Sequence, residues 1–230
     1  MIKAILFDFN GVIIDDEMIQ MKAYQEVFAP YGVALSETQY FQALGMDDST
    51  FVRTAFANAG RELTEETMQG IAAAKQGVYR RLLTDDLPLF PGVKTLLKAT
   101  THEFDLGLVS MANREEIAYI FERAGIGPLF SIVVSAEDVN VCKPAPDCYQ
   151  KGLEKLNERR RTAGKQILSA SECLAVEDSP PGIEAGRAAG MRTLGVLNTV
   201  SEAELRAAGA EVVTKDLADW TVEAIRLVFE

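Results

Sequence analysis

The apolar residues of this chain follow two different spacings. Residues 2–7 form a short, mainly apolar run that stops at Asp8, which is typical of a buried parallel strand. Residues 15–86 show only the spacing of helices, with Ser36 and Thr64 as candidate N-caps. The N-terminal part of the chain therefore predicts one strand followed by a block of helices.

Beyond Pro88 the pattern alternates between strands and helices. We expect strands over residues 106–110, 131–135, 173–177, 193–197 and 211–213, and helices over 93–99, 114–124, 147–156, 182–189, 203–208 and 217–228. This alternation predicts an α/β fold with a parallel sheet and helices on both faces. The helical block is then an insertion. We expect an α/β domain of residues 1–14 and 88–230 and a helical domain of residues 15–87 that acts as a lid.

Composition and charge narrow the classes of partner. The 230 residues carry a net charge of −11, so a nucleic-acid partner is not expected. No apolar run approaches the length that spans a bilayer and no leader precedes the first strand, so we expect no membrane partner. Cys142, Cys148 and Cys173 match neither a CxxC pair nor a disulfide framework, which favours a reduced, cytoplasmic protein.

One basic segment, residues 157–165, interrupts the alternation of strands and helices. It contains Arg159, Arg160, Arg161 and Lys165. Two interpretations stay open: a solvated loop or helix extension, and a docking patch for an anionic partner.

Polar residues follow several predicted strands at the point where each ends. Asp8 and Ser110 end the first two strands, Lys143 follows the third, and the pair Glu177-Asp178 ends the fourth. Each alone has an ordinary interpretation as a turn, cap or surface residue. If they converge on one edge of the sheet, they supply a carboxylate nucleophile, a hydroxyl group, a cation and an acid pair able to bind metal.

The segments that hold these residues form an ordered set of motifs. The segments 8–12, 110–113, 143–147 and 177–186 read DFNGV, SMAN, KPAPD and EDSPPGIEAG. In this order they resemble the four motifs of the haloacid dehalogenase (HAD) superfamily, most closely the subfamily of β-phosphoglucomutase-like enzymes and small sugar-phosphate phosphatases. The resemblance covers nearly the whole chain. It implies a Rossmann-like parallel sheet with an inserted all-helical cap domain.

The resemblance implies a phosphatase of a small phosphorylated metabolite. Asp8 would attack phosphorus and form an aspartyl phosphate, which water then hydrolyses. Ser110 and the backbone amides of Met111 and Ala112 would bind phosphoryl oxygens, and Lys143 would balance the negative charge.

The resemblance also implies Mg²⁺ as cofactor. The ion would lie between Asp8, the backbone carbonyl of Asn10 and Asp178, with Glu177 as an auxiliary ligand. Carboxylate and carbonyl oxygens are ligands that suit Mg²⁺.

Asn10 departs from the pattern of the family. Active phosphatases of this branch carry an aspartate there, which exchanges protons with the leaving group and with water. An amide cannot do so, and general acid–base catalysis is worth about 10²–10⁴-fold in rate, so we expect a weakened enzyme that acts best on good leaving groups. Three explanations stay open: an engineered substitution, a naturally slow or specialised phosphatase, and a phospholigand-binding protein without turnover.

The helical insertion also departs from the mutase pattern. Gln20, three residues after Glu17, occupies the place of a mutase histidine, and the loop at Gly45 lacks the arginine that grips a second phosphate. Lys75 keeps the spacing of a family lysine. We therefore favour a monomeric phosphatase over a phosphotransferase, with substrate contacts from Glu17, Gln20, Gly45, Lys75, Met111 and Ala112. A dehalogenase, which needs no metal, is disfavoured by Glu177-Asp178.

Small residues give the helix predicted after the fourth strand a face for close packing. Gly182, Ala185, Gly186 and Ala189 recur at helical spacing. We interpret this face as packing against the sheet rather than as part of a site.

Overall fold

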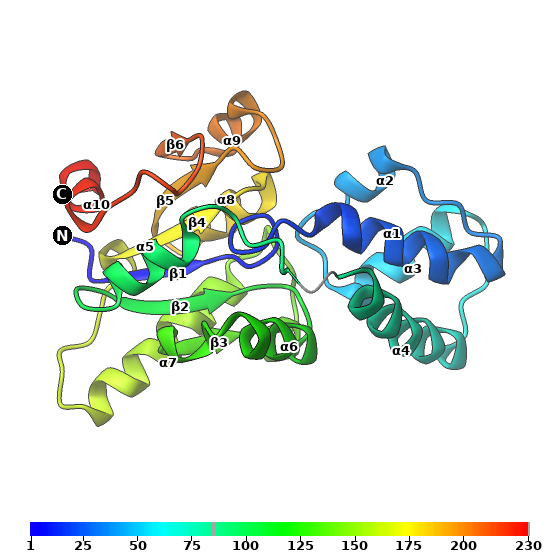
Figure 1. Cartoon of the computed structure of the whole chain (residues 1–230), viewed down its shortest axis with the longest axis horizontal. Helices are drawn as coiled ribbons and strands as arrows, with labels where there is room; N and C mark the ends of the chain where they lie inside the picture. The colour runs from blue at the N-terminus through cyan, green and yellow to red at the C-terminus, as the bar shows by residue number, and fades with distance from the viewer. Residues whose placement is uncertain (84–85, 230) are drawn as a thin grey trace.

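A parallel β-sheet lies at the centre of the larger part of the molecule in the computed structural model, which describes residues 1–83 and 86–229 (Figure 1). Within these residues six strands pair in the order β3-β2-β1-β4-β5-β6. They are β1 (Ala4–Phe7), β2 (Asp105–Val109), β3 (Ile132–Val134), β4 (Cys173–Glu177), β5 (Arg192–Val196) and β6 (Val212–Thr214). The predicted α/β fold is confirmed.

The first strand is central because its neighbours come from distant parts of the chain. Ile5 is in register with Leu106 of β2 on one side and with Leu174 of β4 on the other. All four residues of β1 are buried, as expected for a parallel strand covered on both faces. Since all the strands run the same way, the residues that follow β1, β2 and β4 meet at one edge of the sheet.

Helices cover both faces of the sheet. They are α5 (Val93–Thr100), α6 (Arg114–Ala124), α7 (Asp147–Thr162), α8 (Pro180–Ala188), α9 (Glu202–Ala208) and α10 (Val222–Phe229). Apolar residues of α5, α6 and α10 share one buried cluster, and those of α7 and α8 share another with the opposite face of the sheet. A Cβ added at Gly186 would lie 2.9 Å from the Cβ of Ala175 in β4, so the small residue does let α8 approach the sheet closely.

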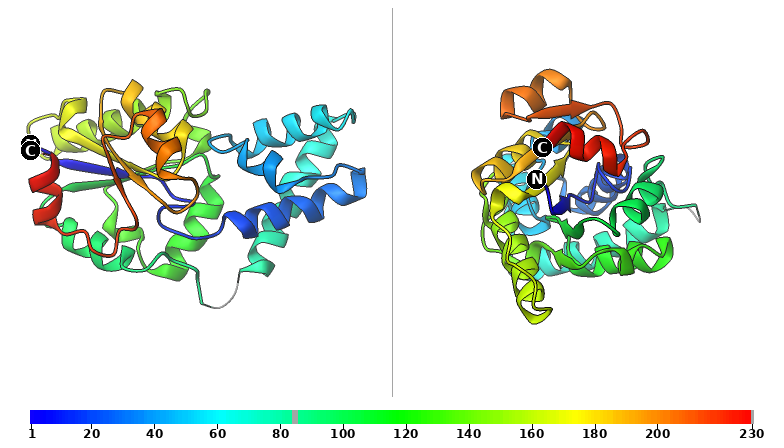
Figure 2. Two further views of the ribbon diagram at one scale, coloured as in Figure 1. Left: turned by 90° about the horizontal axis from the view of Figure 1, so that it is seen from above. Right: turned by 90° about the vertical axis from the view of Figure 1, so that its left-hand side faces the viewer.

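Four helices lie beyond the carboxyl ends of the strands (Figures 1 and 2). They are α1 (Glu17–Phe28), α2 (Glu37–Phe41), α3 (Asp48–Asn58) and α4 (Glu65–Leu82), and we call residues 17–82 the helical unit. Ser36 and Thr64 cap α2 and α4 as predicted. The unit has an apolar cluster of its own, built around Phe28, Phe51 and Phe56. Short 3-10 turns connect other elements at Ala29–Tyr31, Gly127–Leu129, Ala136–Asp138 and Ala170–Glu172.

Several predicted boundaries differ from those observed. The helix predicted from residue 217 begins instead at Val222, because the Thr221 hydroxyl accepts a hydrogen bond from the Ala224 amide at 3.1 Å and caps it there. The basic segment is a helix extension as far as Thr162. The predicted domain limits, 15–87 and 88–230, stay a prediction and include residues 84–85 and 230, which lie outside the described residues.

Across residues 1–83 and 86–229, no helix combines the length and apolar character needed to cross a bilayer.

Replacing Gly92 by alanine tests the turn that returns the chain to the sheet. Gly92 has φ = +78°, and an added Cβ would lie 2.6 Å from the Cα of Ala218. Gly60 has a similar φ of +63° but open space around it. Left-handed backbone costs about 1–2 kcal/mol for alanine, and overpacking about 1–3 kcal/mol more. We expect Gly92→Ala to lower the free energy of urea unfolding more than Gly60→Ala. Equal losses would contradict the close contact.

Candidate active site

A buried lysine joins two carboxylates at the carboxyl edge of the sheet. The Lys143 ammonium lies 2.8 Å from Asp8 after β1 and 2.7 Å from Glu177 at the end of β4. Tyr149 also donates to Glu177, at 2.5 Å. Burial alone would lower the pKa of Lys143, but the charges of Asp8 and Glu177 raise it above its ordinary value. The lysine therefore stays charged and fixes the position of the Asp8 carboxylate.

Asp178 completes a cluster of three acids. Oxygen atoms of Asp8, Glu177 and Asp178 all lie within 4.8 Å of one another. A Cβ at Gly11 would lie 1.9 Å from Oδ2 of Asp178, and φ at Gly11 is +73°, so this carboxylate occupies a cradle that only glycine leaves open. Burial and the charge of Asp8 raise the pKa of Asp178 well above its ordinary value. The acid cluster, with one lysine to offset it, fits a divalent cation bound by oxygen.

Glu177 belongs to the same acid cluster but has partners of its own. Its Oε1 accepts from Lys143 and Tyr149, whereas a Cβ at Gly182 would lie 1.9 Å from Oε2. Oε2 has no hydrogen-bond partner in the part of the chain that the structure describes. The prediction that Gly182 serves packing against the sheet was therefore incomplete, since it also makes room for the Glu177 carboxylate.

The second predicted strand ends in a turn that lines the site. Ser110 is buried, and its Oγ accepts a hydrogen bond from the Ala112 amide at 3.0 Å. Asn113 then caps α6 by accepting from the Glu116 amide at 2.9 Å. The N-cap is therefore Asn113, which leaves the Ser110 hydroxyl to face the site.

The predicted residues surround one cavity of about 100 Å³. Its lining from the sheet side includes Asp8, Asn10, Ser110, Met111, Ala112, Lys143 and Asp178. Its lining from the helical unit includes Glu17, Gln20, Gly45 and Lys75. Of the site residues that the sequence predicts, Glu177 is not in the lining.

Gly45 brings the helical unit against the sheet edge. Its φ is +85°, and an added Cβ would lie 2.9 Å from the Cβ of Pro181 and 3.2 Å from that of Lys143. The loop can therefore close over the cavity only with glycine at this position.

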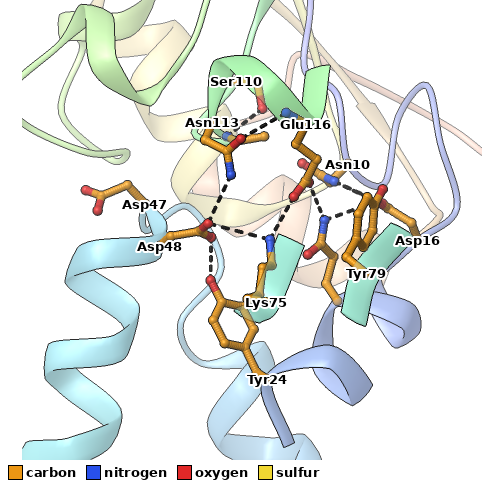
Figure 3. Close-up of polar contacts among 12 residues, drawn as sticks. Asn10, Asp16, Tyr24, Asp47, Asp48, Lys75, Tyr79, Ser110, Asn113 and Glu116 are labelled. Carbon is orange, nitrogen blue, oxygen red and sulfur yellow. Dashed lines mark hydrogen bonds and ion pairs between the residues drawn. The ribbon is translucent and has the colours of Figure 1, made fainter. Parts of the chain in front are cut away.

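Asn10 is held by an acid that the sequence analysis did not identify. Its Nδ2 donates to both carboxylate oxygens of Asp16, each at 3.0 Å (Figure 3). Asp16 is fully buried and also accepts from Tyr79 at 2.5 Å. Burial and the charge of Glu116 raise the pKa of Asp16 to about 7. The amide nitrogen of Asn10 is thus directed at Asp16.

A second polar network joins the helical unit to α6. Glu116 accepts from Lys75 at 2.8 Å and from Gln20 at 2.5 Å. Asp48 accepts from Asn113 at 3.2 Å and lies 3.5 Å from Lys75 (Figure 3). The ammonium of Lys75 therefore faces two carboxylates, one from α6 and one from α3.

Sequence reasoning missed Asp16, Asp48 and Glu116. A usable signal was present for Glu116, which occupies the third position of a helix that starts directly after the second motif. Asp16 directly precedes α1, and no local pattern in the sequence indicates its partner. These acids acquire a role only from contacts between distant segments.

Replacing Lys143 by methionine tests the buried ion pair. Removing one partner leaves Glu177 buried and uncompensated, at a cost of about 3–5 kcal/mol. Without the ammonium, the pKa of Glu177 in the folded state rises further above its unfolded value. Burial and the charge of Asp8 already raise the pKa of Glu177 to about 8. The loss therefore grows as pH rises through that value, and it is smallest at pH 5, where the carboxyl group is protonated with or without Lys143. We expect this from urea unfolding in EDTA at pH 9 and pH 5.

The exposed pair of Lys151 and Glu154, 2.7 Å apart, supplies the control. Lys151→Met should change stability by less than about 0.5 kcal/mol. A Lys143→Met loss that does not depend on pH would argue against an ionised Glu177.

Comparisons with known proteins show what the chain as a whole is similar to. The chain is 25% identical over 217 residues to a phosphorylated carbohydrates phosphatase of Thermotoga maritima, covering 93% of this chain and 94% of that protein. Its fold is similar to that of a β-phosphoglucomutase from Clostridium difficile, with a TM-score of 0.85, 22% identity and coverage of 100% of this chain and 97% of the other.

A further solved structure is similar to this chain in fold. It is an aspartate-to-asparagine mutant of CbbY from Rhodobacter sphaeroides in complex with xylulose-1,5-bisphosphate, with a TM-score of 0.83, 22% identity and coverage of 97% of this chain and 99% of the other. A family model described as haloacid dehalogenase-like hydrolase matches residues 2–190. The chain therefore belongs to the haloacid dehalogenase-like hydrolases.

Proposed function

We propose that the chain is a Mg²⁺-dependent phosphatase of a small phosphorylated metabolite of the sugar-phosphate class, with Asp8 as nucleophile. The observation that supports this most directly is the meeting of Asp8, Lys143 and Asp178 at one cavity. The similarity to a phosphatase of phosphorylated carbohydrates supports the same class of substrate.

The proposed reaction has two steps. The Asp8 carboxylate attacks phosphorus, the bond to the ester oxygen breaks, and that oxygen takes up a proton as it leaves. Water then attacks the phosphorus of the aspartyl phosphate, the bond to Asp8 breaks, and inorganic phosphate is released. Lys143 holds Asp8 in place, and Ser110 donates to a phosphoryl oxygen. The amides of Met111 and Ala112 lie nearby, that of Ala112 donating to the Ser110 Oγ.

The acid cluster is the proposed Mg²⁺ site. Asp8, Asp178 and the backbone carbonyl of Asn10 would hold the ion, while Glu177 acts through Lys143. When bound, Mg²⁺ neutralises phosphoryl charge and orients the phosphoryl group. The cradle at Gly11 supports this assignment for Asp178.

We further propose that the helical unit acts as a cap and that the protein is a cytoplasmic monomer. Contacts of Gly45 with the sheet edge support the cap assignment. Three free cysteines fit a reducing compartment.

The pairing of Asn10 with Asp16 bears on the proton transfer. Two carboxylates 3.0 Å apart cannot both ionise, so an aspartate at position 10 beside Asp16 would share one proton with it. The amide of Asn10 removes this repulsion. A carboxylate is therefore present at position 16 instead of position 10. Its presence supports a slow or specialised phosphatase over a phospholigand-binding protein.

Removal of metal provides the first test. We expect EDTA to abolish hydrolysis of an aryl phosphate, whose leaving group needs no proton, and Mg²⁺ to restore it. Asp178→Asn should raise the Mg²⁺ concentration for half-maximal activity by about tenfold or more. Asp15→Asn is the matched control. Asp15 is exposed, so this variant should leave the Mg²⁺ concentration for half-maximal activity unchanged. Activity that persists in EDTA would contradict the proposal.

Exchanging the two residues at positions 10 and 16 provides the second test. We expect the double variant Asn10→Asp/Asp16→Asn to raise kcat on a sugar phosphate by about 10²–10⁴-fold, because it restores a proton-transfer group without a second acid beside it. Asn10→Asp alone should gain less. Phosphate release in a discontinuous assay measures both.

The alternative function, a phospholigand-binding protein, is favoured by Asn10 itself. It predicts metabolite binding without turnover in the unaltered chain and in both variants, so measured turnover would exclude it.

A further inference from the structure

The side of the cavity that would face a leaving group is acidic. Carboxylates outnumber ammonium groups in the lining, which contains Asp8, Glu17, Asp48, Glu116, Asp178, Lys75 and Lys143. Asp8, Asp178 and Lys143 belong to the sheet edge, where the phosphoryl group would bind. The remaining charged residues lie on the helical unit and on α6, where the rest of the substrate would lie.

Among the described residues that line this side, Lys75 is the one cation, and it is already neutralised. Its ammonium lies 2.8 Å from Glu116 and 3.5 Å from Asp48 (Figure 3). The side chains of Lys75 and Glu116 are only 3% and 2% exposed, so water screens the pair weakly. Lys75 therefore has little charge to offer to a second anionic group.

The same side is rich in hydrogen-bond acceptors. Gln20 lines the cavity and is 5% exposed, and its Oε1 has no hydrogen-bond partner within the described residues. Both hydrogen bonds that its Nε2 donates go to Asp16 and Glu116, which leaves the oxygen as the free group. A buried acceptor without a partner is costly, and a hydroxyl group of a ligand would satisfy it.

We infer that the substrate carries a single anionic group, its phosphate, and a compact leaving group with hydroxyl groups that donate to Gln20 and to the acids of the helical side. Glu116 is then a specificity-determining residue, since it neutralises Lys75 and repels a second phosphate or a carboxylate. The cavity of about 100 Å³ favours a small leaving group. This inference rests on the proposed phosphatase function and names its substrate class.

Two matched pairs of compounds test the inference. Glycerol 3-phosphate carries a hydroxymethyl group where 3-phosphoglycerate carries a carboxylate. Fructose 1,6-bisphosphate carries a second phosphate that fructose 6-phosphate lacks. With the unaltered chain and Mg²⁺, we expect kcat/KM to be about tenfold or more higher for the singly anionic member of each pair, as like charges in a poorly screened cavity repel.

Glu116→Gln should lower the ratio of kcat/KM between the singly and the doubly anionic compound by about tenfold. Lys75 is then free to pair with the added anion. Glu115→Gln is the matched control, as Glu115 is the preceding residue of α6 and its side chain is 72% exposed, so its variant should keep the ratio of the unaltered chain. If Glu116→Gln does not fold, as judged by circular dichroism, Asp48→Asn takes its place with the same expected direction.

Each outcome has a distinct meaning. Equal or faster hydrolysis of the doubly anionic members, or a ratio that Glu116→Gln leaves unchanged, would overturn the inference. Absence of phosphate release from every compound would instead overturn the proposed function. Titration calorimetry with the Asp8→Asn variant then still decides the inference, which expects glycerol 3-phosphate to bind more tightly than 3-phosphoglycerate.

Discussion

A buried ammonium between two carboxylates determines how charge is arranged at the carboxyl edge of the sheet. Lys143 holds Asp8 and Glu177 together across the ends of β1 and β4, and the three groups are almost closed off from water. Asp178 adds a third acid, so negative charge exceeds positive charge within a few ångströms. Such an arrangement is stable only with a further cation or a shared proton, which is why the sheet edge suits a metal-assisted reaction. Gly11 and Gly182 leave the space that these carboxylates occupy.

Opposite this edge, polar contacts come from Asp16, which precedes α1, from Glu116 of α6 and from residues of the helical unit. Asp16 orients Asn10, and Glu116 with Asp48 neutralises Lys75. In the proposed phosphatase, the sheet edge would bind the phosphoryl group, whereas the opposite side, where Lys75 is neutralised, would offer acceptors to the rest of the substrate. Recognition of the phosphate and selection of the attached group would then depend on different residues.

The sequence predicts much of the sheet edge and little of the opposite side, for a physical reason. Buried parallel strands are apolar and short, so the positions of Asp8, Ser110 and Glu177-Asp178 after them follow from local patterns. Tight turns also leave a local mark, as at Gly45. The partnership of Lys75 with Glu116 depends on two helices 41 positions apart in the chain, and no local spacing encodes it. The start of the last helix was predicted at residue 217, too early for a similar reason. Only the hydroxyl of Thr221 sets where this helix begins.

The separate apolar cluster of the helical unit has a consequence for how the chain folds. The central sheet requires Ile5 to pair with Leu106, and the whole helical unit lies in the loop between them. Closing a loop costs entropy that grows with its length, and contacts between distant residues slow folding. The contacts around Phe28, Phe51 and Phe56 are much closer in sequence, so the helical unit can form before the sheet does. Once formed, it would draw the ends of β1 and β2 together and shorten the search by which they pair.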